Sequence, residues 1–314
     1  MSILAHIGDT PLVELARIGR GLPVPVLGKC EHLNPGGSIK DRIALAIVDD
    51  AERRGLLRAG GTLVEATAGN TGVGLALVAA VRGYKLVCVM PAKMSVDKRQ
   101  ALQALGAEVV VTDNAPPSDP RNFQNVARRL AEERGWFSTD QFANPANVAV
   151  HAATTAVEIQ RQVGGPIGAF VAGAGTGGTL SGVGRVLKAA DPRVRIVLAD
   201  PVGSGLAHWV RTGELGADGS YELEGIGSSK VPANLHREVL DDAVTVGDAE
   251  SFAMVQRLVR EEGMLVGGSA GANVAAAVRV AARGNLCGPV VTVLCDAWDR
   301  YRSKPWMQNW PPAP

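Results

Sequence analysis

The sequence Asn34-Pro35-Gly36-Gly37-Ser38-Ile39-Lys40-Asp41-Arg42 marks a sharp turn that leads directly into a helix. Ser38 and Asp41 match the S-x-x-D capping box, so we expect Ser38 to be the N-cap residue and Lys40 to lie in the first helical turn. A lysine is unusual there, because the positive end of the helix dipole disfavours another cation. An uncharged lysine amine can attack an aldehyde and form a Schiff base. Alone, the stretch favours an ordinary exposed lysine, and the rest of the chain reverses that preference.

Length and composition describe an ordinary globular protein. The chain has 314 residues, of which 46% are hydrophobic and 20% are charged, so it is expected to form two domains or one large α/β unit. The net charge is +1, and no basic cluster suggests a nucleic-acid partner. No apolar run reaches the roughly 18 residues of a membrane span, and the N-terminal sequence lacks the charged start of a signal peptide. No membrane partner is therefore expected.

The spacing of cysteine and histidine gives no sign of a metal site or a disulfide framework. No pair among the four cysteines has C-x-x-C spacing, and Cys30, Cys88 and Cys295 lie in or beside apolar runs. They are predicted to be buried, reduced thiols in a cytoplasmic protein. The five histidines are scattered, so no metal is expected. His151 follows a region that is expected to line the site, and the sequence favours a structural role for it.

Apolar strand patterns alternate with helix patterns, which predicts an α/β protein with parallel sheets and helices on both faces. The run at 85–90 is apolar throughout, as expected of a strand buried on both sides. Other strands are expected at 24–29, 62–65, 108–112, 169–172, 194–199, 243–246 and 290–294. Helices are expected up to residues 54, 81, 190 and 282 after the glycine-containing loops, and at 94–105, 121–134, 150–163 and 249–262. Residues 136–150 and 202–234 carry few regular signals.

Three loops place glycine and hydroxyl residues between a strand and a helix, an arrangement that binds anions through backbone N–H groups. The clearest is Gly173-Ala174-Gly175-Thr176-Gly177-Gly178-Thr179, which satisfies the dinucleotide fingerprint G-x-G-x-x-G. Its position in the middle of the chain and its two threonine hydroxyls favour a single phosphate dianion over a dinucleotide. A glycine loop that serves packing alone is the remaining alternative.

The other two loops are ambiguous when they are taken alone. Thr67-Ala68-Gly69-Asn70-Thr71 could hold a carboxylate, with the Asn70 amide on a phenolic oxygen, or it could be an ordinary turn before a helix. In Gly267-Gly268-Ser269-Ala270-Gly271, Ser269 could bond to a ring nitrogen or act as an N-cap.

Five motifs in a fixed order form a much more specific signal. They are N-P-G-G-S-I-K-D-R at 34–42, E-A-T-A-G-N-T-G at 65–72, G-T-G-G-T at 175–179, E-G-I-G at 224–227 and G-G-S-A-G at 267–271. The ordered set resembles the cysteine synthase and cystathionine β-synthase family of pyridoxal-phosphate enzymes, which have the tryptophan-synthase-β fold type. The resemblance covers residues 8 to about 301. It is closest to the catalytic core of cystathionine β-synthase, through the run S-Y-E-L-E-G-I-G at 220–227.

The resemblance implies an α/β fold of PLP fold type II, with two parallel-sheet αβα domains and the cofactor in the cleft between them. Residues 39–147 would form the smaller domain, with the substrate-carboxylate loop. Residues 1–38 and 148–314 would form the larger domain, with the phosphate cup. A homodimer is also implied.

The resemblance assigns cofactor contacts by position. Lys40 matches the lysine that forms the Schiff base with pyridoxal 5′-phosphate and later moves the α-proton. Asn70 matches the asparagine beside the 3′-hydroxyl. Ser269 matches the serine on the pyridine nitrogen, which favours β-elimination because it leaves that nitrogen unprotonated. The phosphate cup is matched by Gly175, Thr176, Gly177, Gly178 and Thr179.

Substrate contacts are assigned in the same way. Gln141 matches a glutamine that meets the substrate carboxylate, and Gly225, Ile226 and Gly227 match the segment at the mouth of the site. The loop that closes on the carboxylate is matched by Thr67, Ala68, Gly69, Asn70 and Thr71. Ala68 departs from the serine usual in the family, and Ser228 departs from a frequent tyrosine, so both leave substrate choice open.

The implied reaction is β-replacement on L-serine or an O-activated L-serine through a bound aminoacrylate, with addition of a thiol. The alternatives are a cysteine synthase that uses O-acetylserine or O-phosphoserine with sulfide, a cysteine desulfhydrase and, more remotely, a non-catalytic binding relative. Such relatives can lose the lysine or the phosphate cup, whereas this chain has both Lys40 and residues 175–179.

Overall fold

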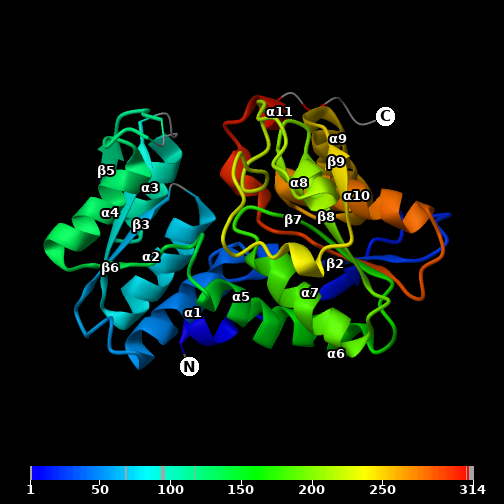
Figure 1. Cartoon of the computed structure of the whole chain (residues 1–314), viewed down its shortest axis with the longest axis horizontal. Coiled ribbons are helices and arrows are strands. Elements are labelled where there is room, and N and C mark those ends of the chain that lie inside the picture. Colours follow the sequence, from blue (N-terminus) through cyan, green and yellow to red (C-terminus); the bar gives the residue numbers. More distant parts are fainter. Residues whose placement is uncertain (1, 68, 93–95, 117, 309, 311–314) are drawn as a thin grey trace. The chain divides into compact units, whose positions relative to one another are not determined.

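The computed structural model describes residues 2–67, 69–92, 96–116, 118–308 and 310 (Figure 1). Contacts divide the chain into two units, each built around one sheet. Unit 1 comprises Met1–Ile7 and Asn34–Asn147, and unit 2 comprises Gly8–Leu33 and Val148–Pro314.

The sheet of unit 1 is parallel and has the strand order β5-β4-β3-β6. Its strands are β3 (Thr62–Ala66), β4 (Lys85–Pro91), β5 (Glu108–Thr112) and β6 (Phe137–Ser138). Its helices are the 3₁₀-helix η1 (Ile3–His6), α1 (Lys40–Arg53), α2 (Asn70–Arg82), α3 (Val96–Ala104) and α4 (Phe123–Arg134), and α5 (Ala146–Val150) runs across the boundary to unit 2.

Helices cover both faces of this sheet. Side chains alternate between the faces of a strand, and in β3 Leu63 packs in one apolar cluster with residues of α1, α2 and α3. Its neighbour Val64 packs in a second cluster with residues of α4. Strand β4 lies beside β3 in the same sheet and is covered on both faces in the same way, which explains why it is apolar along almost its whole length.

The sheet of unit 2 has the strand order β1-β2-β10-β7-β8-β9. All its pairs are parallel except β1 with β2, which is antiparallel. Its strands are β1 (Leu12–Glu14), β2 (Val26–Lys29), β7 (Ala169–Gly173), β8 (Arg195–Pro201), β9 (Asp242–Val246) and β10 (Val290–Val293). Its α-helices are α6 (Ala156–Val163), α7 (Gly178–Ala190), α8 (Leu206–Thr212), α9 (Asp248–Glu262), α10 (Gly268–Ala282) and α11 (Pro305–Gln308). Its other helical turns are η2 (Glu31–Leu33), η3 (His151–Thr155), η4 (Arg237–Val239) and η5 (Trp298–Tyr301).

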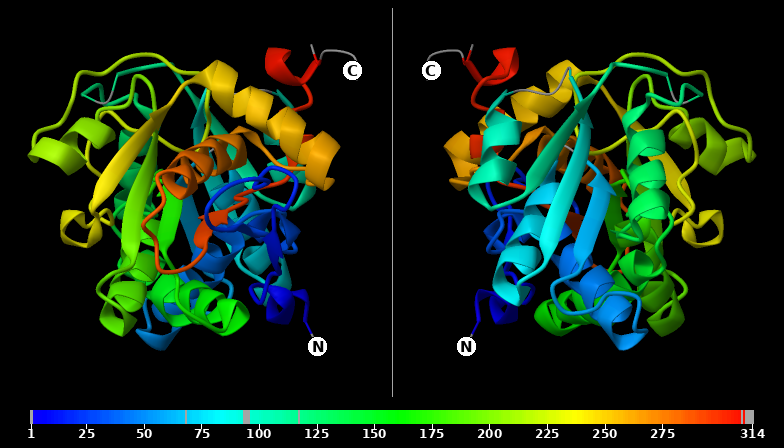
Figure 2. Two further views of the ribbon diagram at one scale, coloured as in Figure 1. Left: turned by 90° about the vertical axis from the view of Figure 1, so that its right-hand side faces the viewer. Right: turned by 90° about the vertical axis from the view of Figure 1, so that its left-hand side faces the viewer.

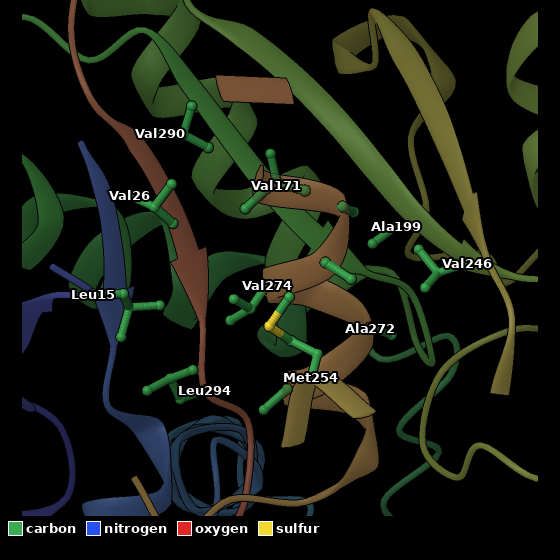
Figure 3. Close-up of a cluster of buried hydrophobic side chains, with 14 of the residues drawn as sticks. Leu15, Val26, Val171, Ala199, Val246, Met254, Ala272, Val274, Val290 and Leu294 are labelled. Atoms are coloured by element: carbon green, nitrogen blue, oxygen red, sulfur yellow. The ribbon is translucent and has the colours of Figure 1, made fainter. Parts of the chain in front are cut away.

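The core of unit 2 lies between its sheet and helix α10, and α9 packs against α10 (Figure 2). Figure 3 shows side chains of the strands meeting those of α9 and α10. On the opposite face, Ile196 of β8 approaches α7, where its Cγ2 lies 3.2 Å from the Cβ position of Gly184. Both faces are therefore covered, as the alternation of strand and helix predicts.

The structure confirms the α/β class and most of the expected elements, with local differences. The short strands β1 and β6 and the helix α8 were not expected. The helix expected at 150–163 begins as the π-helix η3 before it becomes α6. Cys30 and Cys88 are buried as expected, whereas Cys295 is half-buried and Cys287 is exposed. In the part of the chain that the structure describes, no helix combines the length and apolar character needed to cross a membrane.

Candidate active site

The turn before α1 differs from the capping box expected from the sequence. The N-cap residue is Ile39, and its side chain makes no capping bond. Ser38 Oγ accepts a hydrogen bond from the Lys40 N–H at 3.2 Å, and the Asp41 carboxylate accepts one from the Gly36 N–H. The chain already turns at Ser38, whose carbonyl accepts the Asp41 N–H at 3.2 Å. A Cβ at Gly36 would lie 2.5 Å from Asp41 Oδ1, so glycine there permits the close approach of the carboxylate.

Lys40 is the first residue of α1 and is half-buried. Within the described residues, no hydrogen bond or ion pair engages its ammonium group. Lys29 of unit 2 provides a contrast, because its fully buried ammonium bonds to Glu158 at 2.6 Å and to Gln162 at 2.9 Å. An amine without an acidic partner among the described residues is available for chemistry at Nζ, and the role of Lys40 in a Schiff base stays a prediction.

The loop before α2 contains the predicted carboxylate site. α2 begins at Asn70 after the N-cap residue Gly69, and no side chain caps it. The first N–H groups of a helix have no partner within the helix and can bind an anion. Thr67 is buried and its Oγ1 accepts the Gly69 N–H at 3.2 Å. The predicted contact at Ala68 lies outside the described residues.

The start of α1 is held against α2. A Cβ at Gly74 would lie 3.1 Å from the carbonyl oxygen of Lys40 and 3.0 Å from Ala44 Cβ. A side chain at position 74 would require α1 to shift by a few tenths of an ångström, so glycine favours this close approach. Unit 1 therefore brings the lysine and the helix that follows the carboxylate loop into contact.

Gln141 joins this loop through a buried network. The Thr71 hydroxyl donates to Gln141 Oε1 at 2.6 Å, and the two residues are 3% and 6% exposed. Gln141 in turn donates to Glu65, from its backbone N–H at 3.2 Å and from Nε2 at 3.4 Å. The Thr139 hydroxyl also donates to Glu65. Burial raises the pKa of Glu65, although these hydrogen bonds act in the opposite direction.

Sequence reasoning missed Glu65, although a signal was present. It is a charged residue inside a strand whose other central positions are apolar. A carboxylate is tolerated in a protein interior where hydrogen-bond donors surround it. Glu65 thus marks the place where the start of α2 meets the segment after β6.

In unit 2, the loop between β7 and α7 has the features of a phosphate site. The N-cap residue Gly177 has a φ of 87°, and no side chain caps α7. A Cβ at Gly175 would lie 2.2 Å from the Gly225 carbonyl oxygen, and one at Gly177 would lie 2.5 Å from Leu235 Cβ. Glycine therefore lets the loop pack closely against residues 225 and 235, and the first N–H groups of α7 have no partner within the helix. This arrangement fits a phosphate dianion.

Thr179, the last residue of the predicted phosphate cup, contacts an unexpected partner. Its hydroxyl and Nε2 of His151 form a hydrogen bond of 3.3 Å, and His151 Nδ1 bonds to Thr155 Oγ1 at 2.9 Å. His151 opens the π-helix η3, and π-helical turns occur frequently at functional sites. The buried imidazole thus orients a hydroxyl of the phosphate loop.

The predicted mouth segment packs against the same loop. The Gly227 N–H donates to the Ala174 carbonyl at 2.9 Å, and Ile226 is buried. The adjacent Ser228 hydroxyl donates to the Lys230 carbonyl at 2.6 Å, and Lys230 is exposed. Unit 2 therefore brings residues 225–227 and the phosphate cup together.

Ser269 is the second residue of α10, and Gly267 is the N-cap. The interpretation of Ser269 as an N-cap is therefore wrong. Ser269 is buried at the helix start. The same helix is tied to the phosphate loop by Asn273, whose Oδ1 accepts the Gly173 N–H at 2.7 Å. Sequence reasoning could not find Asn273, because it lies 100 positions from Gly173.

Each unit, taken by itself, has residues that fit one part of pyridoxal phosphate. The glycine loop at α7 fits its phosphate, and the amine of Lys40 fits its aldehyde. Ser269 offers a hydroxyl of the kind that a pyridine nitrogen accepts. Each observation is independent of the others.

Comparison with known proteins agrees with these features. A family model described as pyridoxal-phosphate dependent enzyme matches residues 3–296. A cystathionine beta-synthase of Oryctolagus cuniculus is 45% identical over 98% of this chain, which spans 56% of that protein's length. A cysteine synthase of Staphylococcus aureus is 44% identical over 97% of this chain and 96% of its own.

The fold agrees as well. The crystal structure of an O-ureido-L-serine synthase matches with a TM-score of 0.90 and 40% identity, covering 100% of this chain and 96% of that one. These matches confirm the family and the fold type that the motifs predicted. The chain belongs to the family of pyridoxal-phosphate-dependent enzymes, in the β-replacement group that includes cystathionine β-synthase and cysteine synthase.

Proposed function

We propose that the protein replaces the β-substituent of L-serine, or of an O-activated L-serine, with a thiol, as a cystathionine β-synthase does. The identity of 45% to such a protein and the motif at 220–227 support this choice. Pyridoxal phosphate, when bound, supplies the electron sink for charge that develops at the substrate's Cα. The protein's task is then to hold the amino acid and to move its α-proton.

The site residues take separate roles in this proposal. Lys40 Nζ accepts the α-proton. Gly175, Thr176, Gly177, Gly178 and Thr179 hold the cofactor's phosphate, Asn70 lies at its 3′-hydroxyl and Ser269 at its ring nitrogen. The substrate's carboxylate is bound by Thr67, Ala68, Gly69, Asn70, Thr71 and Gln141. The segment 225–227 lines the entrance.

A cysteine synthase reaction, with O-acetylserine or O-phosphoserine and sulfide, is the second candidate. The Staphylococcus aureus cysteine synthase supports it, because this chain covers 96% of that protein at 44% identity. Ala68 and Ser228 lie at positions where the chain departs from its family, so neither favours one amino acid over the other. Release of sulfide from cysteine is a further outcome for the same site.

The ammonium of Lys40, which has no hydrogen-bond or ion-pair partner among the residues that the structure describes, is the observation that carries the proposal. Purified protein with added pyridoxal phosphate is expected to absorb visible light and to turn over either L-serine with homocysteine or O-acetyl-L-serine with sulfide. Lys40→Ala is expected to lose the visible absorbance that wild-type protein shows with pyridoxal phosphate. Its turnover is expected to fall at least ~100-fold. Lys85→Ala, which changes an exposed lysine of unit 1, is the matched control. Wild-type protein that takes up no pyridoxal phosphate would refute the proposal.

We further propose that residues 39–147 and the remainder act as a smaller and a larger domain, and that the protein is a cytoplasmic homodimer. The family resemblance supports these assignments. Light scattering on the purified protein tests the oligomeric state, with a mass of twice 32.6 kDa expected.

A further inference from the structure

We propose that Glu65 is a positioning residue of the substrate-carboxylate site, which fixes the side-chain amide of Gln141 and, through it, the hydroxyl of Thr71. The inference rests on the proposed function, because that function places Thr71 and Gln141 at the substrate's carboxylate. It adds a residue that touches neither substrate nor cofactor.

Glu65 lies inside β3 and is 4% exposed. Both carboxylate oxygens accept hydrogen bonds from the segment after β6. Oε2 accepts from the Thr139 hydroxyl and from the Gln141 backbone N–H at 3.2 Å, and Oε1 accepts from Gln141 Nε2 at 3.4 Å. A buried carboxylate with three donors is held firmly in place.

The two acceptor oxygens of Glu65 decide which way the Gln141 amide points. Both oxygens accept hydrogen bonds from residues 139 and 141, whereas a glutamine amide has a donating and an accepting end. The donating Nε2 must therefore face Glu65, which turns Oε1 toward Thr71. The Thr71 hydroxyl then donates its single proton to Gln141 Oε1 at 2.6 Å. The carboxylate thus sets the direction of two hydrogen bonds in succession.

The backbone of this segment has anchors of its own. Asn147 Nδ2 donates to the Gln141 carbonyl at 2.8 Å, and Asn144 Nδ2 donates to the Thr139 carbonyl at 3.0 Å. The Thr139 N–H bonds to the Val64 carbonyl at 3.2 Å. Because these contacts hold the main chain, the distinctive contribution of Glu65 is the orientation of the Gln141 side chain.

A neutral side chain at position 65 removes this control. With a glutamine there, either end of the Gln141 amide can face it, and Thr71 can donate or accept in return. One of the three donors around position 65 also faces an N–H₂ group instead of an oxygen. An anionic substrate would then meet a mixture of donor arrangements, and binding of its carboxylate would weaken.

Glu65→Gln tests the inference in the full-length protein loaded with pyridoxal phosphate. We expect the KM for L-serine or O-acetyl-L-serine to rise about tenfold, which corresponds to one poorly made buried hydrogen bond. The dissociation constant of pyridoxal phosphate, read from its absorbance, should stay within about twofold, because its phosphate loop lies in unit 2. Glu108→Gln, which changes an exposed glutamate on strand β5 of the same sheet, should change neither value.

A double-mutant cycle separates positioning from general destabilisation. If Glu65 acts through Gln141, Glu65→Gln should add less than about twofold to the KM of a Gln141→Ala protein. Additive effects would overturn the inference, as would an unchanged KM in Glu65→Gln. Should Glu65→Gln not fold, Thr139→Val removes one donor from the same carboxylate, and a KM increase that vanishes in the Gln141→Ala background is then expected. A wild-type protein that binds no pyridoxal phosphate would count against the proposed function and not against this network.

Discussion

The hydroxyl of Thr71 donates to Oε1 of Gln141 at 2.6 Å, although 70 positions of chain separate the two residues. The bond joins the first turn of α2 to the segment after β6. The proposed function assigns both groups to the substrate's carboxylate. The bond ties the first turn of α2 to Gln141, which reduces the ordering that binding must achieve.

Removal of the Thr71 hydroxyl should weaken substrate binding selectively. Thr71→Val keeps the shape of the side chain but leaves Gln141 Oε1 without this donor, so we expect the KM for the amino-acid substrate to rise about tenfold. Thr71→Ser keeps the hydroxyl and should stay within about threefold of wild type. Steady-state kinetics of the two variants provide the comparison. Equal values for valine and serine would show that the hydroxyl plays no part.

The phosphate loop should not tolerate a methyl group at Gly177. Its φ is 87°, and a Cβ there would lie 2.5 Å from Leu235 Cβ. Gly177→Ala is expected to destabilise the fold by about 1–3 kcal/mol and to weaken pyridoxal-phosphate binding.

Gly247 provides the control, because it also precedes a helix. Its φ is −80°, and no heavy atom among the described residues lies within 4 Å of its Cβ position. Gly247→Ala should cost about 1 kcal/mol or less. Urea denaturation measures the stability of both variants, and absorbance titration measures cofactor affinity. Similar losses in both would refute the special role of Gly177.

Ser269 should matter for the cofactor and not for its helix. Because Gly267 is the N-cap of α10, Ser269→Ala is expected to change the free energy of unfolding of the apoprotein by less than about 0.5 kcal/mol. The absorbance maximum of bound pyridoxal phosphate should shift.

Asn122 gives the contrast, because it is a true N-cap whose Oδ1 accepts the Gln124 N–H at 3.0 Å. Asn122→Ala should cost about 1 kcal/mol and leave the spectrum unchanged. A spectrum that stays the same in Ser269→Ala would remove Ser269 from the site.

Glu65 should make the protein's stability depend on pH in a defined direction. Burial raises its pKa in the folded protein, so the folded state binds a proton more readily than the unfolded chain does. The stabilisation is complete below the pKa of the unfolded chain and is lost as the pH rises through the folded pKa.

The measurement is the difference in free energy of unfolding between wild type and Glu65→Gln. This difference should move in favour of wild type as the pH falls from about 8 to about 4, because glutamine cannot take up the proton. A difference that is constant over that range would contradict the raised pKa.

Long apolar elements were predictable from the sequence. β4 and α10 end within a residue or two of the expected positions, because their apolar patterns run over many residues. α8 has seven residues between Gly205 and Gly213, which is too short for a helical period to stand out. β1 has three residues and is defined by its antiparallel pairing with β2. Its own composition does not indicate a strand.

The loops of the candidate site were predictable from the sequence, but the hydrogen bonds that hold these loops in place were not. Ser38 and Asp41 matched the common capping-box pattern. In the structure the turn starts earlier, because the Asp41 N–H donates to the carbonyl of Ser38, three residues back. Glu65 and Gln141 lie 76 positions apart, and no spacing rule in one sequence relates a residue of β3 to a residue in the segment after β6. Only the folded sheet shows that they meet.

The approach of α1 to Gly74 of α2 has a consequence for how such an enzyme can diversify. Backbone meets backbone there, so the distance from the amine-bearing helix to the carboxylate loop does not depend on any rotamer. Under the proposed function, residues of the loop before α2 can be exchanged by mutation while Lys40 keeps its place. The contact between the two helices would then keep the proposed proton-transferring lysine constant while the choice of substrate changes.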